Sequence, residues 1–178
     1  MRFDDVWMPA WQLNKLCELA IMSSPVGEAI EIGVYQGLSA ISIANAIYPA
    51  TLHAVDHWEG STDFRPEMLA RDNYGIFLSN IAEGVRGNIQ IHKQDWSEFA
   101  HLWSDHNWDS KIGFLHLDAE HTRNEVYDQI KAFLPYMAEG SNMAGDDYNW
   151  PGVHEGVRTH FAYERVHVMH NKLWWVEF

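Results

Sequence analysis

The sequence predicts an α/β fold in which helices cover both faces of a mostly parallel, seven-stranded sheet. Short apolar runs alternate with longer segments of helical spacing, which is typical of parallel strands joined by helices. The last two strand-like runs have no helix between them, so we expect an antiparallel strand at the C-terminal end of the sheet. No repeat, low-complexity tract or linker interrupts the pattern, and residues 1–178 are expected to form one domain.

The expected elements follow one another in order along the chain. We expect strands over residues 28–34, 51–56, 88–92, 111–118, 141–147, 165–169 and 172–178. We expect helices over residues 38–47, 66–85, 97–103 and 122–137, and a last helix that follows a Pro-Gly turn and ends at residue 161. Thr122 and Glu125 have the spacing of a capping box, which marks a helix start.

Composition and charge restrict the class of protein. The chain has 12 basic and 25 acidic residues, a net charge of −13, and 47% hydrophobic residues, enough apolar surface for a core. The negative charge repels phosphate groups, so we expect neither nucleic acid nor a membrane surface as the main partner. The single cysteine, Cys17, cannot form an internal disulfide, and the first residues lack the pattern of a signal peptide, so we expect a cytoplasmic location. Nine tryptophans are compatible with a homo-oligomer.

A glycine turn follows the first expected strand, in the segment EIGVYQGLSA of residues 31–40. Gly33 and Gly37 allow a ligand to approach the backbone, and Ser39 places a hydroxyl near a helix N-terminus, which attracts a carboxylate or phosphate. Tyr35 occupies the second glycine position of the dinucleotide fingerprint, which disfavours a pyrophosphate there. Asp56 ends the next strand, where it is either a surface acid or an acceptor for ribose hydroxyls.

Acidic residues lie in or just after several expected strands: Glu31, Asp56, Asp95, Asp118, Asp146 and Asp147. Ligands of open α/β sheets bind at the carboxyl ends of the strands, so we expect these acids to converge on one rim. Asp118, Asp146 and Asp147 end neighbouring strands and would repel one another unless protonated or neutralised. Mg²⁺ or a similar divalent cation would neutralise them, and His121 has a pKa range suited to a general base. The alternatives are a solvated Asp-Asp turn and an ordinary surface histidine.

The glycine segment resembles the cofactor loop of catechol O-methyltransferase and its cation-dependent relatives, which are class I S-adenosylmethionine-dependent methyltransferases with a Rossmann-like fold. The resemblance implies that Tyr35 and Ser39 contact the methionine moiety and that Asp56 binds ribose. It also implies that Asp95 and Trp96 flank the adenine, although Asp95 also has the spacing of a helix cap. The expected cofactor-binding set is Glu31, Gly33, Tyr35, Gly37, Ser39, Asp56, Asp95 and Trp96.

The segments LHLDAEHTRNEVYDQIKAFLPYMAEG and MAGDDYNWPGV are similar to cation-dependent O-methyltransferases that modify the sugars of macrolide antibiotics. That resemblance implies that Asp118, Asp146 and Asp147 hold a cation and that His121 is the base acting on a small-molecule or sugar hydroxyl. Catechol enzymes have a lysine near the position of His121, so a catechol acceptor is not implied. The short segment before the first strand leaves little room for a lid.

Other features leave alternatives open. Trp58 and Trp150 would either stack on an acceptor ring or cover the edge of the core. A nucleotide-dependent oxidoreductase is disfavoured by Tyr35, and a non-catalytic cofactor-binding module leaves the acids and His121 without a role. A metal-dependent hydrolase leaves the glycine turn and Asp56 unexplained. The sequence therefore favours methyl transfer.

Overall fold

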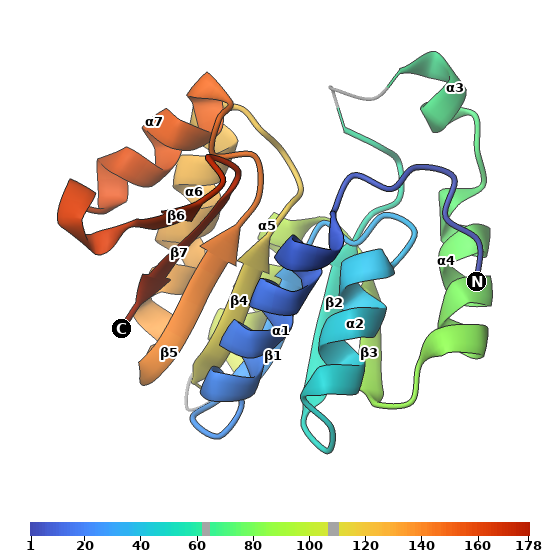
Figure 1. Ribbon diagram of the computed structural model, residues 1–178, viewed down its shortest axis with the longest axis horizontal. Coiled ribbons are helices and arrows are strands. Elements are labelled where there is room, and N and C mark those ends of the chain that lie inside the picture. Colours follow the sequence, from blue (N-terminus) through green and yellow to red (C-terminus); the bar gives the residue numbers. More distant parts are fainter. Residues whose placement is uncertain (62–64, 107–110) are drawn as a thin grey trace.

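The computed structural model describes residues 1–61, 65–106 and 111–178. These residues form one seven-stranded sheet in the order β3-β2-β1-β4-β5-β7-β6 (Figure 1). Strands β1 to β5 are parallel, and β7 pairs antiparallel with both β5 and β6. The strands are β1 (Glu28–Ile32), β2 (Thr51–Asp56), β3 (Asn88–Lys93), β4 (Ile112–Leu117), β5 (Met137–Gly145), β6 (His167–Met169) and β7 (Leu173–Glu177). The predicted fold class is confirmed.

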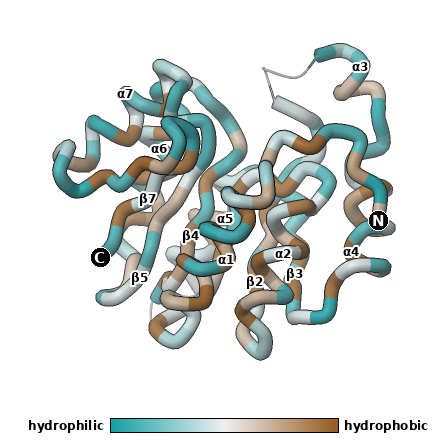
Figure 2. The backbone as a smooth tube through the Cα atoms, in the orientation of Figure 1, coloured by the Kyte–Doolittle hydropathy of each residue, from teal (hydrophilic) through white to brown (hydrophobic). Residues whose placement is uncertain are grey.

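Helices cover both faces of the sheet, and each face has its own hydrophobic core. The helices are α1 (Ala10–Ser23), α2 (Leu38–Ala46), α3 (Pro66–Leu69), α4 (Asn73–Gly84), α5 (Trp96–His106), α6 (Arg123–Phe133) and α7 (Pro151–His160), and 3₁₀ turns cover Leu134–Tyr136 and Tyr163–Arg165. One core joins α1, α2 and α4 to the sheet, and the other joins α5, α6 and α7 to it. Every residue of β4 is buried, as a central parallel strand between two helical layers requires. Figure 2 shows the hydrophobic colouring along β4, β2 and α2.

Helix α1 was not expected from the sequence. It buries Leu16, Leu19 and Ala20 against α2 and the sheet. These positions have the three- and four-residue spacing of a helical face, so the pattern was present in the sequence. None of the helices in the described ranges combines the length and the apolar character needed to span a bilayer.

The single helix expected over residues 66–85 is instead two helices, α3 and α4. The side chain of Asp72 accepts a hydrogen bond from the Gly75 backbone N–H, which caps a new helix at that point. A Cβ on Gly75 would lie 2.2 Å from the Asp72 carboxylate, so the glycine permits the cap. Gly75 therefore lies in the first turn of α4, where the absence of a side chain leaves room for the capping carboxylate.

The loops after β1, β4 and β5 lie together at one rim of the sheet. The Asp118 N–H donates to the Ile32 carbonyl at 2.8 Å, and the Asp146 N–H donates to the Leu117 carbonyl at 3.3 Å. Gly33 has a φ of +86°, and a Cβ there would lie 2.1 Å from the Asp118 carbonyl oxygen. Glycine is required at this crossing because any side chain would separate the two loops.

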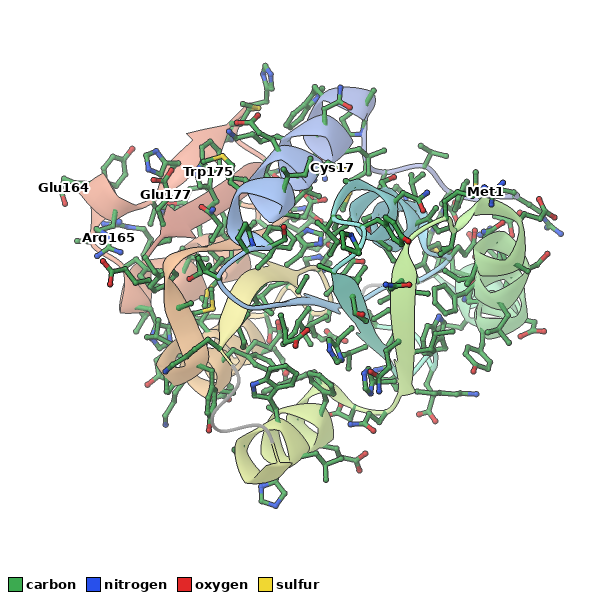
Figure 3. All side chains as sticks on the ribbon, turned by 90° about the horizontal axis from the view of Figure 1, so that it is seen from below. Met1, Cys17, Glu164, Arg165, Trp175 and Glu177 are labelled. Atoms are coloured by element: carbon green, nitrogen blue, oxygen red, sulfur yellow. The ribbon has the colours of Figure 1, made fainter. Side chains whose placement is uncertain are left out.

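The N-terminal segment, residues 1–9, runs from α4 across the upper ends of β2 and α2 to α1 (Figure 1). Its amino group pairs with Glu83 of α4, and Asn80 of α4 bonds both backbone groups of Arg2. Figure 3 shows Met1 at the opposite side of the molecule from the C-terminal hairpin, where Arg165 donates to the Glu177 carbonyl. The segment is therefore fastened to α4 before it reaches the rim.

Candidate active site

A cleft of about 780 Å³ opens at the carboxyl ends of the strands. Loops that follow β1, β2, β3, β4 and β5 line it, together with part of the N-terminal segment. Eleven of the twelve residues expected at the site line this cleft: Gly33, Tyr35, Gly37, Ser39, Asp56, Asp95, Trp96, Asp118, His121, Asp146 and Asp147. Of the six acids expected to converge on one rim, Asp56, Asp95, Asp118, Asp146 and Asp147 do so.

Glu31 is the exception, and its expected place at the rim is wrong. The side chain is fully buried, and its Oε1 lies 2.9 Å from Nδ1 of His116, also fully buried. The two residues are register partners on β1 and β4. Their neighbours Ala29 and Phe114, two positions earlier, belong to the core under α1 and α2, so strand alternation directs Glu31 to that face.

Asp56 holds the glycine turn in place. Its Oδ2 accepts the backbone N–H groups of Val34 and Tyr35, both at 2.9 Å, and its Oδ1 accepts the N–H of Trp58 at 2.6 Å. A carboxylate offers about four acceptor positions, so Asp56 retains capacity for a hydroxyl in the cleft. The Asp56 carboxylate therefore fixes the backbone of the glycine turn and of the Trp58 loop relative to each other.

Helix α2 begins at the cleft wall. Its N-cap, Gly37, has a φ of +88° and makes no side-chain cap bond. A Cβ at Gly37 would lie 2.8 Å from the ring of Phe77, so a side chain would have to displace the core. Ser39 lies in the first turn of this helix, and the helix N-terminus with its hydroxyl suits an anionic group such as a carboxylate.

The third strand contributes Asp95 and Trp96. Asp95 Oδ1 accepts the Ser97 N–H at 2.8 Å, so it caps α5, the helix-cap alternative raised by its spacing. The Trp96 indole N–H donates to Glu125 of α6 at 3.2 Å. Both residues also line the cleft, so the capping role and a place beside a ligand are compatible.

The N-terminal segment closes one side of the cleft with Phe3, Asp5, Trp7 and Met8, none of which the sequence analysis identified. The Tyr35 hydroxyl donates to Asp5 at 2.9 Å, Arg71 pairs with the same carboxylate, and the Trp7 ring stacks on the Tyr35 ring at 5.0 Å. Burial and the bond to Asp5 raise the pKa of Tyr35 to about 12. The short N-terminal segment therefore contributes directly to the wall of the cleft.

The acids after β4 and β5 meet across the cleft from the glycine turn. One ligand atom from each of Asp118, His121 and Asp147 lies within 4.8 Å of the others. His121 Nε2 is 3.2 Å from Asp147 Oδ2. Burial and the neighbouring Asp146 raise the pKa of Asp118 well above its usual value. The structure therefore brings Asp118, His121 and Asp147 together, whereas Asp146, the third acid expected to hold a cation, is not among these grouped ligand atoms.

Lys172 also reaches this cluster, and the sequence analysis did not identify it. Its ammonium donates to Asp146 Oδ2 at 2.9 Å and to Asp147 Oδ1 at 3.0 Å. Burial alone would raise the pKa of Asp147, but hydrogen bonds from His121 and Lys172 lower it overall. No sequence motif links Lys172 to the acids, because the contact depends on how the C-terminal hairpin folds back.

Trp58 and Trp150 lie at the cleft in different ways. The Trp58 ring packs on Tyr74 and Phe77 at 4.8 Å each, so it covers the edge of the core while lining the cleft. The Trp150 side chain is 40% exposed, and its ring lies 4.8 Å from the ring of His121. Trp150 is therefore exposed beside His121, unlike Trp58, which is packed into the edge of the core.

A family model described as a methyltransferase domain matches residues 30–148, more than half of the chain and the whole of the segment that carries the glycine turn and the acids. The chain belongs to this methyltransferase family. A comparison with curated protein sequences gave no match.

Solved structures of methyltransferases share the fold. CalS11, a calicheamicin methyltransferase, is 15% identical with a TM-score of 0.72, and the alignment covers 96% of this chain and 80% of that one. TomG from Streptomyces achromogenes, an O-methyltransferase of tomaymycin synthesis solved with S-adenosylmethionine, is 18% identical with a TM-score of 0.70, covering 99% and 84%. An O-methyltransferase from Bacillus cereus, solved with S-adenosylhomocysteine, is 14% identical with a TM-score of 0.70, covering 99% and 84%. At these identities the likeness establishes the class I methyltransferase fold.

The acidic cluster of this methyltransferase has the donor set of a divalent-cation site. Asp118, Asp146 and Asp147 supply carboxylate oxygens, which hard cations prefer. The ammonium of Lys172 offsets one of the three carboxylate charges when all are ionised, and burial together with the neighbouring Asp146 raises the pKa of Asp118. The residues present therefore fit such a cation.

Proposed function

We propose that this methyltransferase transfers the methyl group of S-adenosylmethionine to a hydroxyl of a small molecule or sugar with the help of a divalent cation. The observation that carries the proposal is a single cleft with the glycine turn and Asp56 on one wall and the acids with His121 on the other. TomG and the Bacillus cereus enzyme support it, because both are O-methyltransferases that were solved with this cofactor or its product.

The cofactor would lie along the loops after β1, β2 and β3. Tyr35 and Ser39 would hold its methionine end at the N-terminus of α2. Asp56 would accept the ribose hydroxyls, and Asp95 with Trp96 would flank the adenine. The acids of the cleft favour a cationic sulfonium over an anionic ligand of similar size.

Asp118, Asp146 and Asp147 would hold the cation, and the acceptor hydroxyl would lie within reach of His121. When bound, the cation lowers the pKa of that hydroxyl, and the sulfonium supplies the methyl group. His121 would accept the hydroxyl proton at a ring nitrogen, and Asp147, 3.2 Å away, would stabilise the imidazolium that forms. The C–O bond forms as the C–S bond breaks, with the sulfur leaving as a neutral thioether.

The protein contributes mainly by positioning the two reactants. The charges of an alkoxide and a sulfonium cancel in the transition state, so little new charge needs stabilising there, and alignment matters more. Trp150 beside His121 forms a flat wall against which an acceptor ring would lie. The N-terminal segment would limit water access above Tyr35 through Trp7 and Asp5.

The proposal also keeps the partners expected from composition. Because the net charge is −13, we propose that nucleic acid and anionic membranes are not partners of this protein. We also propose that the protein acts in the cytoplasm, a reducing compartment that suits a single cysteine. We also propose that the protein can form a homo-oligomer, and sedimentation velocity tests this by measuring its mass in solution.

Methyl transfer from labelled S-adenosylmethionine to a panel of sugars, phenols and aliphatic alcohols tests the proposal, with and without chelator. A thermal-shift comparison of S-adenosylmethionine with NAD separates the cofactor classes. We expect stabilisation by S-adenosylmethionine alone and a labelled ether product that chelator removes. Stabilisation by NAD alone would contradict the cofactor assignment, and full turnover in excess chelator would contradict the role of the cation.

A further inference from the structure

Every oxygen of the Asp146–Asp147 pair already has a close polar neighbour. Asp146 Oδ1 accepts the Asp147 backbone N–H at 2.7 Å, and its Oδ2 accepts the Lys172 ammonium at 2.9 Å. Asp147 Oδ1 accepts the same ammonium at 3.0 Å, and its Oδ2 lies 3.2 Å from His121 Nε2. A divalent cation that binds this pair must therefore share a carboxylate oxygen with the group that now contacts it, or displace that group.

The fold places Lys172 at the pair. Residues 170–172 connect the paired ends of β6 and β7, and the Lys172 N–H donates to the Met169 carbonyl at 3.1 Å across the turn. His170 and Asn171, the central residues of this turn, have φ values of 50° and 54°. The Lys172 carbonyl accepts the Tyr148 N–H at 2.8 Å. The hairpin is thus joined by its backbone to the loop that carries both acids, which fixes the position of the Lys172 Cα.

The ammonium itself can still leave the pair. The Lys172 side chain is 24% exposed, and both Lys172 and the acids line the cleft. A flexible four-carbon stem gives the ammonium other positions toward solvent. Asp146 is 3% exposed, so it loses a buried counter-ion whenever the ammonium leaves and no other cation replaces it.

We infer that Lys172 is a built-in competitor of the divalent cation: its ammonium holds Asp146 and Asp147 in the cation-free protein and is displaced when the cation binds. Lys172 thereby lowers the affinity for the cation and offsets one carboxylate charge of the pair between turnovers. This inference rests on the cation site of the proposed function. It assigns Lys172 a positioning role, not a catalytic one.

Isothermal titration calorimetry with Mg²⁺ or Mn²⁺ alone, on the intact protein, tests the inference. Two charge-assisted hydrogen bonds are given up on displacement, so Lys172→Met should bind the cation about 10- to 100-fold more tightly than wild type. Lys172→Arg keeps a competing cation and should stay near wild type. Lys15→Met is the matched control, because Lys15 pairs with Glu18 on α1 and its removal changes net charge without touching the cluster.

A second measurement uses the wild-type chain, so it does not depend on a variant that folds. The hydrogen-bonded ammonium of Lys172 should give a ¹H–¹⁵N signal in the cation-free protein, assigned by its loss in Lys172→Gln, and the signal should disappear when Mg²⁺ saturates the site. A signal that persists at saturation would overturn the inference. In chelator, Lys172→Met should also unfold at a lower temperature than wild type, and saturating Mg²⁺ should raise its unfolding temperature more.

The measurements distinguish a failure of the Lys172 inference from a failure of the proposed cation site. Equal or weaker cation binding by folded Lys172→Met overturns the inference and leaves the proposed cation site in place. Absence of cation binding in wild type, Lys172→Met and Lys172→Gln alike overturns the cation part of the proposed function, and the inference with it. Binding of S-adenosylmethionine is measured in each variant to show that the cofactor half is intact.

Discussion

Replacing Asp56 by alanine removes at once three hydrogen bonds that two carboxylate oxygens accept from the glycine turn and its neighbouring loop. The N–H groups of Val34, Tyr35 and Trp58 lose their partner. Each donor left without a partner costs at least about 1 kcal/mol, and access of water to the cleft keeps the cost near that lower limit, so the total is about 3 kcal/mol. For a domain of this size that loss lowers the unfolding temperature by about 6–12 °C.

Differential scanning calorimetry without ligand measures this effect, and calorimetric titration with S-adenosylmethionine measures the affinity. Asp56→Asn retains one carbonyl oxygen and should lie between alanine and wild type in unfolding temperature. Asp128→Asn is the control, because Asp128 is an exposed acid on α6 away from the turn. An unfolding temperature of Asp56→Ala within 2 °C of wild type, against the roughly 6–12 °C expected, would refute the reasoning that Asp56 organises the loop.

Three further substitutions test other parts of the site. His121→Ala should lower turnover by at least about 100-fold while leaving S-adenosylmethionine affinity unchanged, and equal turnover would remove it as the base. Asp118→Asn should raise the unfolding temperature in chelator: burial and Asp146 raise the pKa of Asp118, so its ionised form costs stability at neutral pH, a cost that disappears as the pH falls through the raised pKa. A lower unfolding temperature for this variant would contradict that sign. Asp5→Ala should bring the pKa of Tyr35 down from about 12, as measured by ultraviolet titration against Tyr35→Phe, and an unchanged pKa would show that Asp5 does not hold the phenol.

The wall of the cleft that carries the glycine turn was predictable because the residues of that turn are adjacent in the sequence. Gly33 and Gly37 bracket a turn between a strand and a helix, and backbone geometry alone requires glycine where φ is positive. Asp56 ends β2, Asp118 and Asp146 directly follow β4 and β5, and a parallel sheet brings the carboxyl ends of its strands to one edge.

Glu31 shows the limit of that argument. It lies one residue before the end of β1, and the two-residue repeat of a strand turns its side chain to the core under α1 and α2 instead of the rim. The match between Glu31 and a buried His116 depends on the register of β1 with β4, which the pattern of either strand alone does not contain.

The amino-acid sequence by itself determined the sheet, the order of its loops and most of the acids at the rim. These features depend on the periodicity of neighbouring residues and on where each strand ends, and both can be read from short segments of the chain. The tertiary structure decided which distant side chains complete the site: Asp5 on Tyr35, and Lys172 on Asp146 and Asp147. Those contacts join segments that are distant in the chain, and no short-range pattern specifies them. They arise where the N-terminal segment and the C-terminal hairpin fold back onto the same rim.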